Sequence, residues 1–220
     1  MDPIKFELFG LHLQEPIAVV TNLLVSIFCF FAYYRLRNLT DEANYWWRLF
    51  FLIFGISTIF GAMGHAFFLY FGIPGKFPCW IVGTIGNACA AKGMLSIISA
   101  VEPKKYASWL VLIKSIVLLA LALITQKFIF IAIDAILTYL VYAGVFGWFL
   151  LKRGIIEMRF MVIGVIVSLP SVFIFTMKLN PHRWLNKDDL SHLLMLVTLY
   201  YFYRGLKAWG TRTVLITTNV

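Results

Sequence analysis

The segment "YASWLVLIKSIVLLALALIT", residues 106–125, runs for twenty residues with one charge, at Lys114. A helix of about 20 apolar residues is long enough to cross the hydrocarbon core of a bilayer. The whole chain has the same character, because 61% of its residues are hydrophobic, only 13% are charged and its mean hydropathy is +0.87. Soluble domains are far more polar than this. We therefore expect an integral membrane protein.

Seven apolar segments are long enough to span a membrane, and the connectors between them are short. These features predict an all-α fold with seven transmembrane helices in a single domain over residues 1–220. The predicted spans are Pro16 to Tyr34, Trp46 to Phe71, Cys79 to Ala100, Tyr106 to Thr125, Phe128 to Leu151, Met158 to Met177 and Leu190 to Trp209. The first fifteen residues lack the basic start and apolar core of a cleaved signal peptide, so we assign them to the mature protein.

Basic residues are distributed unevenly over the two sides of this predicted bundle. One side has Arg35, Arg37, Arg48, Lys104, Lys105, Lys152, Arg153, Arg159, Arg204, Lys207 and Arg212, and the other has Lys5, Lys76, Lys127, Lys178, Arg183 and Lys187. Because Lys and Arg are retained in the cytoplasm, this predicts that the N-terminus is outside and the C-terminus cytoplasmic. We expect a multi-pass protein of a plasma or inner membrane, with membrane lipids as partners. The net charge of +9 then reflects topology and not nucleic-acid binding.

Several polar residues fall at one level inside the predicted spans. His65 lies six residues before the outer end of its span, roughly 9 Å deep, and Asp134, Asn87 and His192 come to similar levels in the outer half. Ionisable residues in a membrane are costly and usually face the bundle interior or a wet cavity. Their shared depth therefore indicates a candidate site.

The last predicted span begins with "NKDDLSH", residues 186–192. His192 is four residues from Asp188 and three from Asp189, and both spacings place a pair on one helical face. With His65, such a pair makes a three-ligand set of the kind that a catalytic Zn²⁺ requires. The alternative is helix capping, with Asn186 or Asp188 as N-cap and the acidic side chains favoured by the helix dipole. Capping is favoured for the aspartates, whereas for His65 a site and a satisfied interior histidine stay open.

This arrangement resembles the seven-helix membrane hydrolase superfamily of alkaline ceramidases, adiponectin/progestin receptors and haemolysin-III-like proteins. The resemblance implies that a histidine late in the second helix and an HxxxH pair in the last helix hold zinc, with a serine four residues before the first histidine and an assisting aspartate. His65 matches the first position, and Asp188 and His192 match the pair. Gly61 replaces the serine, with Ser57 one turn farther along.

The resemblance implies a metal-dependent hydrolase that acts on a lipid amide or ester near the outer interface. Asp134 and Asp189 are the candidate catalytic bases. Asn87, Ser57 and Lys92 are candidate substrate-binding residues, Lys92 because it could hold an anionic group.

The two lysines within the spans allow other interpretations. Lys114 is expected to reach Asp134 on the adjacent helix as a structural ion pair, and this is favoured over any function for Asp134. The competing function is a non-catalytic lipid or small-molecule binding or signalling module, or the membrane subunit of a larger complex. A transporter in which Asp134, Lys114 and Lys92 move protons is a third possibility. Bound metal favours the hydrolase, and a metal-free site favours the binding module.

Overall fold

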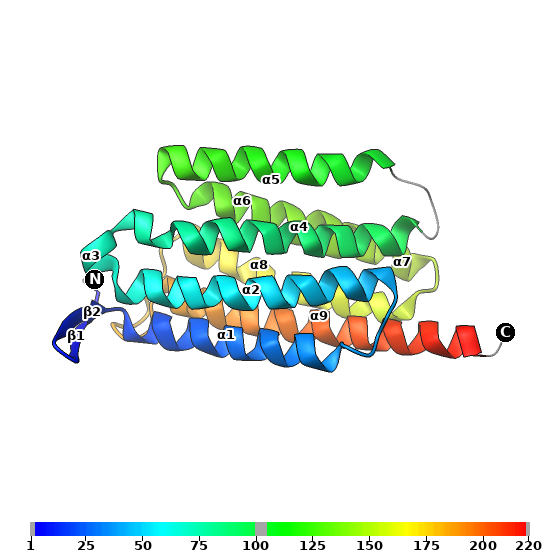
Figure 1. The fold of residues 1–220 in the computed structure, drawn as a ribbon, viewed down its shortest axis with the longest axis horizontal. Helices are drawn as coiled ribbons and strands as arrows, with labels where there is room; N and C mark the ends of the chain where they lie inside the picture. Colours follow the sequence, from blue (N-terminus) through cyan, green and yellow to red (C-terminus); the bar gives the residue numbers. More distant parts are fainter. Residues whose placement is uncertain (1–2, 100–104, 219–220) are drawn as a thin grey trace.

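The computed structural model describes residues 3–99 and 105–218, which form a bundle of long helices lying side by side, with a β-hairpin at one end (Figure 1). The single-segment helices are α1 (Pro16–Arg35), α2 (Glu42–Ala66), α4 (Phe77–Ser99), α5 (Lys105–Thr125), α8 (Arg159–Thr176) and α9 (Lys187–Thr218). Three consecutive segments form one further long helix: α6 (Ile129–Leu137), the π-helix η2 (Thr138–Phe146) and α7 (Gly147–Lys152). Short turns complete the fold: α3 (Phe68–Phe71), η1 (Ile73–Lys76) and η3 (Ile156–Met158).

Among the described residues, six helices are long and apolar enough to cross a membrane, at Pro16–Arg35, Glu42–Ala66, Ile73–Ile98, Tyr106–Thr125, Ile129–Lys152 and Ile156–Thr176. They correspond to the first six predicted spans, and the seventh, Leu190 to Trp209, lies within α9. The third span was predicted to end at Ala100, which lies outside the described residues. The second was predicted to continue to Phe71, but α2 ends at Ala66 and the chain turns through α3.

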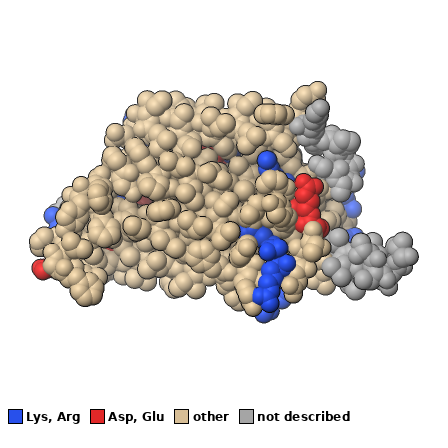
Figure 2. Space-filling view, in the orientation of Figure 1, with Lys and Arg blue, Asp and Glu red and all other residues tan. Residues whose placement is uncertain are grey.

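The surface of the bundle fits an apolar environment. Large apolar side chains are exposed along the helices, such as Ile116 of α5 and Ile27 of α1, which are 66% and 65% exposed. Figure 2 shows a long side of the molecule with Lys, Arg, Asp and Glu gathered toward its ends. The chain therefore has the surface of a membrane protein, with apolar residues outside as well as inside.

The packing order brings the first and last helices together. α1 packs against α2 and α9, α2 packs against α4, and α8 packs against α9, while α5 lies at one edge of the bundle against α4 and α6 (Figure 1). The predicted neighbourhood of the fourth and fifth spans is thus confirmed. The hairpin and the end of α9 lie at opposite ends of the bundle, and we call the former the hairpin end.

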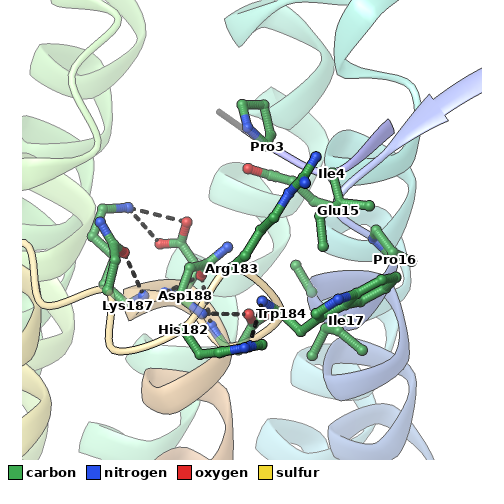
Figure 3. Close-up of a pocket in the computed structure, with 14 residues that line it drawn as sticks. Pro3, Ile4, Glu15, Pro16, Ile17, His182, Arg183, Trp184, Lys187 and Asp188 are labelled. Atoms are coloured by element: carbon green, nitrogen blue, oxygen red, sulfur yellow. Dashed lines mark hydrogen bonds and ion pairs between the residues drawn. The ribbon is translucent and has the colours of Figure 1, made fainter. Parts of the chain in front are cut away.

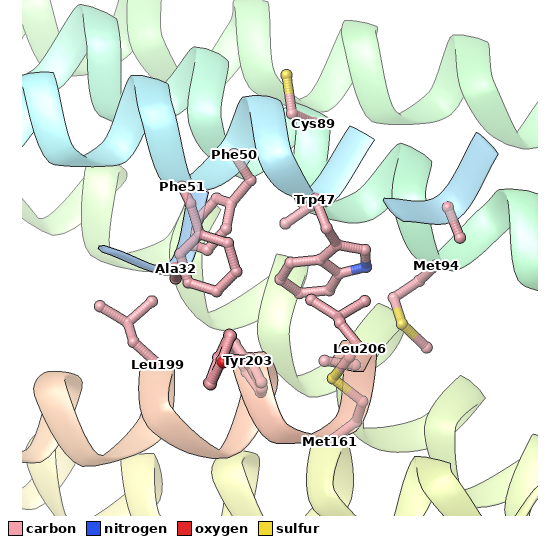
Figure 4. Packing of buried hydrophobic residues seen from close by; sticks show 14 of the residues in the cluster. Ala32, Trp47, Phe50, Phe51, Cys89, Met94, Met161, Leu199, Tyr203 and Leu206 are labelled. Atoms are coloured by element: carbon pink, nitrogen blue, oxygen red, sulfur yellow. The ribbon is translucent and has the colours of Figure 1, made fainter. Parts of the chain in front are cut away.

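The centre of the bundle is an aromatic core shared by α2, α4 and α9 (Figure 4). Trp47 is fully buried and meets the Phe202 ring edge-on, with centroids 5.4 Å apart. α4 approaches closely because Gly93 faces this indole, and a Cβ there would lie 2.5 Å from Trp47 Cδ1. Close approach through a glycine is common in membrane bundles.

A hairpin precedes α1 and was not predicted. Strands β1 (Lys5–Leu8) and β2 (Leu11–Gln14) pair antiparallel through a turn at Phe9 and Gly10, both with positive φ. Two consecutive left-handed residues are typical of a type I′ turn. The hairpin contacts the bundle through the His12 N–H, which donates to the Tyr70 hydroxyl at 3.0 Å. Its last link to α1 is Glu15, whose N–H donates to the Ile4 carbonyl at 2.8 Å.

Candidate functional site

The two histidines singled out from the sequence meet at the hairpin end of the bundle. His65 lies in the last turn of α2 and His192 near the start of α9, and their ring centroids are 6.0 Å apart with the planes nearly perpendicular. They come together because α9 packs beside α1 and α2. The spacing of residues along the chain could not establish this contact.

The Glu15 carboxylate contacts the ring of His65. The sequence did not single out Glu15 as a candidate site residue. Its Oε2 lies 2.5 Å from His65 Nδ1. Glu15 has φ 54° and ψ 55°, in the left-handed region, and directly precedes Pro16. A non-glycine residue in this region is strained, and a following proline disfavours helical backbone further. The backbone is therefore held in an unfavourable conformation at the point that delivers the carboxylate.

The charges around Glu15 favour its ionised form. Burial alone would raise the pKa of the carboxyl group, but the hydrogen bond and charge of His65, together with the Lys76 ammonium, outweigh burial and lower the pKa. A carboxylate accepts hydrogen bonds only, so it receives the Nδ1 proton of His65. The lone pair of a neutral His65 then lies on Nε2.

The second histidine is oriented by α1. Thr21 Oγ1 lies 3.0 Å from His192 Nδ1 and donates its own proton to the Ile17 carbonyl at 2.9 Å. When the Thr21 proton is on the Ile17 carbonyl, Thr21 accepts from His192 Nδ1, and in that arrangement the lone pair of His192 lies on Nε2. The Asn22 Nδ2 group lies 3.3 Å from Nδ1 and 3.4 Å from Nε2 of the same ring.

Gly61, where the resemblance would place a serine, has little room for a side chain. A Cβ on Gly61 would lie 2.8 Å from Asn22 Oδ1, closer than real Cβ contacts allow. The Asn22 amide of α1 therefore fills the space that a side chain at position 61 would need. Ser57, one turn farther along, is buried and donates to the Cys79 carbonyl at 2.9 Å. Its hydroxyl ties α2 to α4.

The start of α9 forms a capping box. Asn186 Oδ1 accepts from the N–H groups of Asp188 and Asp189 at 2.7 and 3.1 Å, and Asp189 Oδ2 accepts from the Asn186 N–H at 2.8 Å. This reciprocal pattern satisfies three of the backbone donors at the helix start. Asn186 is thus the N-cap, and Asp189 has a capping role. Burial raises the pKa of Asp189, an effect opposed by the Asn186 N–H.

Asp188 lies at the same end of the bundle but forms an ion pair with its neighbour Lys187. Its two oxygens lie 2.9 and 3.0 Å from Lys187 Nζ. Burial would raise its pKa, but the Lys187 ammonium outweighs burial and lowers it, with smaller contributions from His65 and Lys76. Within residues 3–99 and 105–218, no three His, Cys, Asp or Glu side chains are arranged to hold a metal ion.

A pocket opens beside these groups, between the start of α1 and the connector from α8 to α9 (Figure 3). Its volume is about 170 Å³. Glu15 and Asp188 line it, whereas the two histidines lie outside its lining. The remaining lining residues are Pro3, Ile4, Pro16, Ile17, Ala18, Asn180, His182, Arg183, Trp184, Asn186, Lys187 and Asp189.

Asp134 belongs to a different cluster, between α4, α5 and α6. It is fully buried, and Lys114 Nζ lies 2.6 Å from Oδ1, which confirms the predicted ion pair. Ser115 Oγ donates to Oδ1 at 3.2 Å and Asn87 Nδ2 to Oδ2 at 2.9 Å. These polar partners come from α4 and α5, so the structure does not bring Asp134 to the histidine pair.

The other predicted substrate-binding residues have structural partners too. Asn87 accepts from the Tyr139 hydroxyl at 2.9 Å in addition to its bond with Asp134. Lys92 places its Nζ over the Trp46 ring, 4.6 Å from the centroid. A cation over an indole face is a favourable contact for a lysine inside a bundle.

Comparison with known proteins gives one match. The chain matches a family described as a family of unknown function (DUF6962) over residues 17–211. Neither a curated protein nor a solved structure matches the chain. Because the match spans α1 to α9, including both histidines, the chain belongs to the DUF6962 family.

Proposed function

We propose that the protein is a metal-dependent membrane hydrolase that holds Zn²⁺ between His65, His192 and Asp188 and cleaves a lipid amide or ester, as its resemblance to the ceramidase-like superfamily implies. In this proposal α9 is a seventh span, the hairpin end faces outside and the C-terminus is cytoplasmic. The observation that carries the proposal is the histidine pair. Each ring has an acceptor at Nδ1 and a lone pair at Nε2, and the two rings are 6.0 Å apart.

Two imidazoles and one carboxylate are ligand types that a catalytic Zn²⁺ uses. Imidazole nitrogens bind Zn²⁺ at about 2.0–2.1 Å, so two rings on one ion have centroids roughly 5–6 Å apart. Metal-binding histidines usually donate their other N–H to a carboxylate, which is the contact that Glu15 makes with His65. Asp188 must turn from Lys187 to bind. Because this pair is partly exposed, its loss costs about 1 kcal/mol or less.

Bound zinc would supply an activated water and polarise a carbonyl. The chain's own residues have separate tasks in the proposal. Glu15 and Thr21 fix the two imidazoles, and Asp189 is the favoured base because it lies at this end of the bundle, where burial raises its pKa. Asp134 is not proposed as the base, since its oxygens are occupied by Lys114, Ser115 and Asn87.

The test is the metal content of detergent-purified protein by mass spectrometry, followed by assays on lipid amides and esters. We expect about one zinc per chain in the wild type, and its loss in His65→Ala and His192→Ala. His12→Ala is the matched control at the same end of the bundle, because the His12 side chain makes no hydrogen bond or ion pair within the described part of the chain. A wild type that is folded, exposed to zinc and still free of metal would overturn the proposal.

The second candidate is a non-catalytic lipid-binding module on the same bundle. Two observations favour it: Gly61 and Asn22 exclude a serine at the family position, and Lys187 neutralises Asp188. A metal-free protein that binds lipid, with binding unchanged in His65→Ala, would support this alternative.

A further inference from the structure

We propose that the pocket at the hairpin end binds the phosphate of a phospholipid headgroup through Arg183. This inference names the substrate class of the proposed hydrolase as phosphate-bearing lipids. That the bound lipid is a substrate rests on the proposed function. The inference is based on three groups that lie together at the mouth of this pocket: a guanidinium without a partner in the described part of the chain, an exposed indole and an apolar helix face.

The charges that line the pocket are paired, with one exception. Glu15 contacts His65, Lys187 contacts Asp188, and Asp189 accepts from the helix start. Arg183 is exposed, lines the pocket and has no hydrogen bond, ion pair or ring contact through its guanidinium with any residue in the described part of the chain. Figure 3 shows its side chain extending from the connector across the pocket. The lining carries three carboxylates and two cations, and Arg183 is the one of these groups without a partner among the described residues, so its guanidinium is available to an anion.

Guanidinium is the side-chain group best matched to phosphate, because its planar fork donates two parallel hydrogen bonds and it is always charged. Trp184 lines the same pocket and is 52% exposed. An exposed indole is typical of the headgroup level of a membrane, where one edge of the ring is polar and its face apolar. The two neighbouring residues thus provide contacts for a charged group and for the lipid backbone beneath it.

The wall opposite the connector indicates that the phosphate comes from a lipid. Pro16 and Ile17 line the pocket, and the same side of α1 continues with Val20, Leu24 and Ile27, which are 51%, 45% and 65% exposed. Residues 17, 20, 24 and 27 have the i, i+3, i+7, i+10 spacing of one helical face. An acyl chain lying along this face would have its phosphate at Arg183. Its ester linkage would be near the level of Thr21, which contacts His192.

The test measures binding of short-chain lipids to the full protein in detergent, after treatment with a chelator. The probes are dihexanoyl phosphatidylglycerol, dihexanoylglycerol without phosphate, and inorganic phosphate. We expect the phospholipid to bind at least about tenfold more tightly than either other probe, and Arg183→Gln to remove this preference. Arg183→Lys should retain part of it, and Lys127→Gln, which removes a positive charge outside the pocket, should leave it unchanged.

Each alternative result overturns the inference. Equal binding of dihexanoylglycerol would exclude the phosphate contact, and equal binding of inorganic phosphate would show an anion site that does not recognise lipid. An Arg183→Gln protein with wild-type affinity would place the phosphate elsewhere. Because the protein is free of metal throughout, these outcomes are independent of the zinc measurements that test the proposed function.

Discussion

The ion pair between Lys114 and Asp134 is expected to fasten α5 to the bundle. Lys114 Nζ donates to Asp134 Oδ1, to the Asp134 carbonyl at 3.1 Å and to Thr138 Oγ1 at 2.7 Å. Breaking a buried pair by removing one partner costs about 3–5 kcal/mol in soluble proteins, whereas single polar contacts in membrane bundles reach about 1.7 kcal/mol. Because the ammonium keeps two of its three contacts, we expect Asp134→Asn to lower the free energy of unfolding by about 2–3 kcal/mol.

The assay is reversible unfolding in mixed micelles, applied as a double-mutant cycle. Lys114→Met should also destabilise, because, in the described part of the chain, it leaves the fully buried Asp134 carboxylate with only the neutral side-chain donors Ser115 and Asn87. The double variant carries neither charge and should lie within about 1 kcal/mol of the wild type. If the double variant instead loses the sum of the two single effects, the residues are not coupled and the reasoning is refuted.

Three further predictions concern the hairpin end. Gly61→Ser should destabilise the fold by about 1–3 kcal/mol, because its Cβ would meet Asn22 Oδ1 at 2.8 Å, and adding Asn22→Ala should recover part of this loss in the same unfolding assay. The lowered pKa of Glu15 means that its contact with His65 contributes fully above about pH 4.3 and is lost as the pH falls through the lowered value. Thermal melts should therefore drop more steeply in acid for the wild type than for Glu15→Gln; parallel curves would contradict this. Asn186→Ala should cost about 1 kcal/mol by removing the cap of α9, and an unchanged melting temperature would show that the cap is not needed.

The helices were predictable because each depends on a local run of apolar residues. Structural details that depend on packing between helices could not be predicted in this way. The helical segment between Ile129 and Lys152 is predominantly apolar, and nothing in the hydropathy distinguishes its π-helical middle from α-helix. The break at Ala66 was missed for the same reason, since "FFLYFG" continues the apolar run up to Gly72. The hairpin had a signal, because "KFEL" and "LHLQ" flank Phe9 and Gly10.

The candidate site was predictable only in part. His65 and His192 are conspicuous because imidazoles are rare inside apolar segments, and the Lys114–Asp134 pair follows from two charges on adjacent helices. Thr21 of α1 could not be singled out, since a threonine in a span is unremarkable until its facing helix is known. Glu15 could have been suspected as an acid directly before the first span, but its link to His65 depends on a left-handed backbone that no pattern indicates.

The conformation at Glu15 also affects how the hairpin joins the bundle. Pro16 fixes its own φ, and Glu15 lies in the left-handed region, so these two residues set the direction in which the chain passes from the hairpin into α1. The hairpin rests against the bundle at Tyr70, while its tip, Phe9, is 94% exposed. The hairpin is therefore attached to the bundle at two places, through His12 to Tyr70 and through Glu15 to His65.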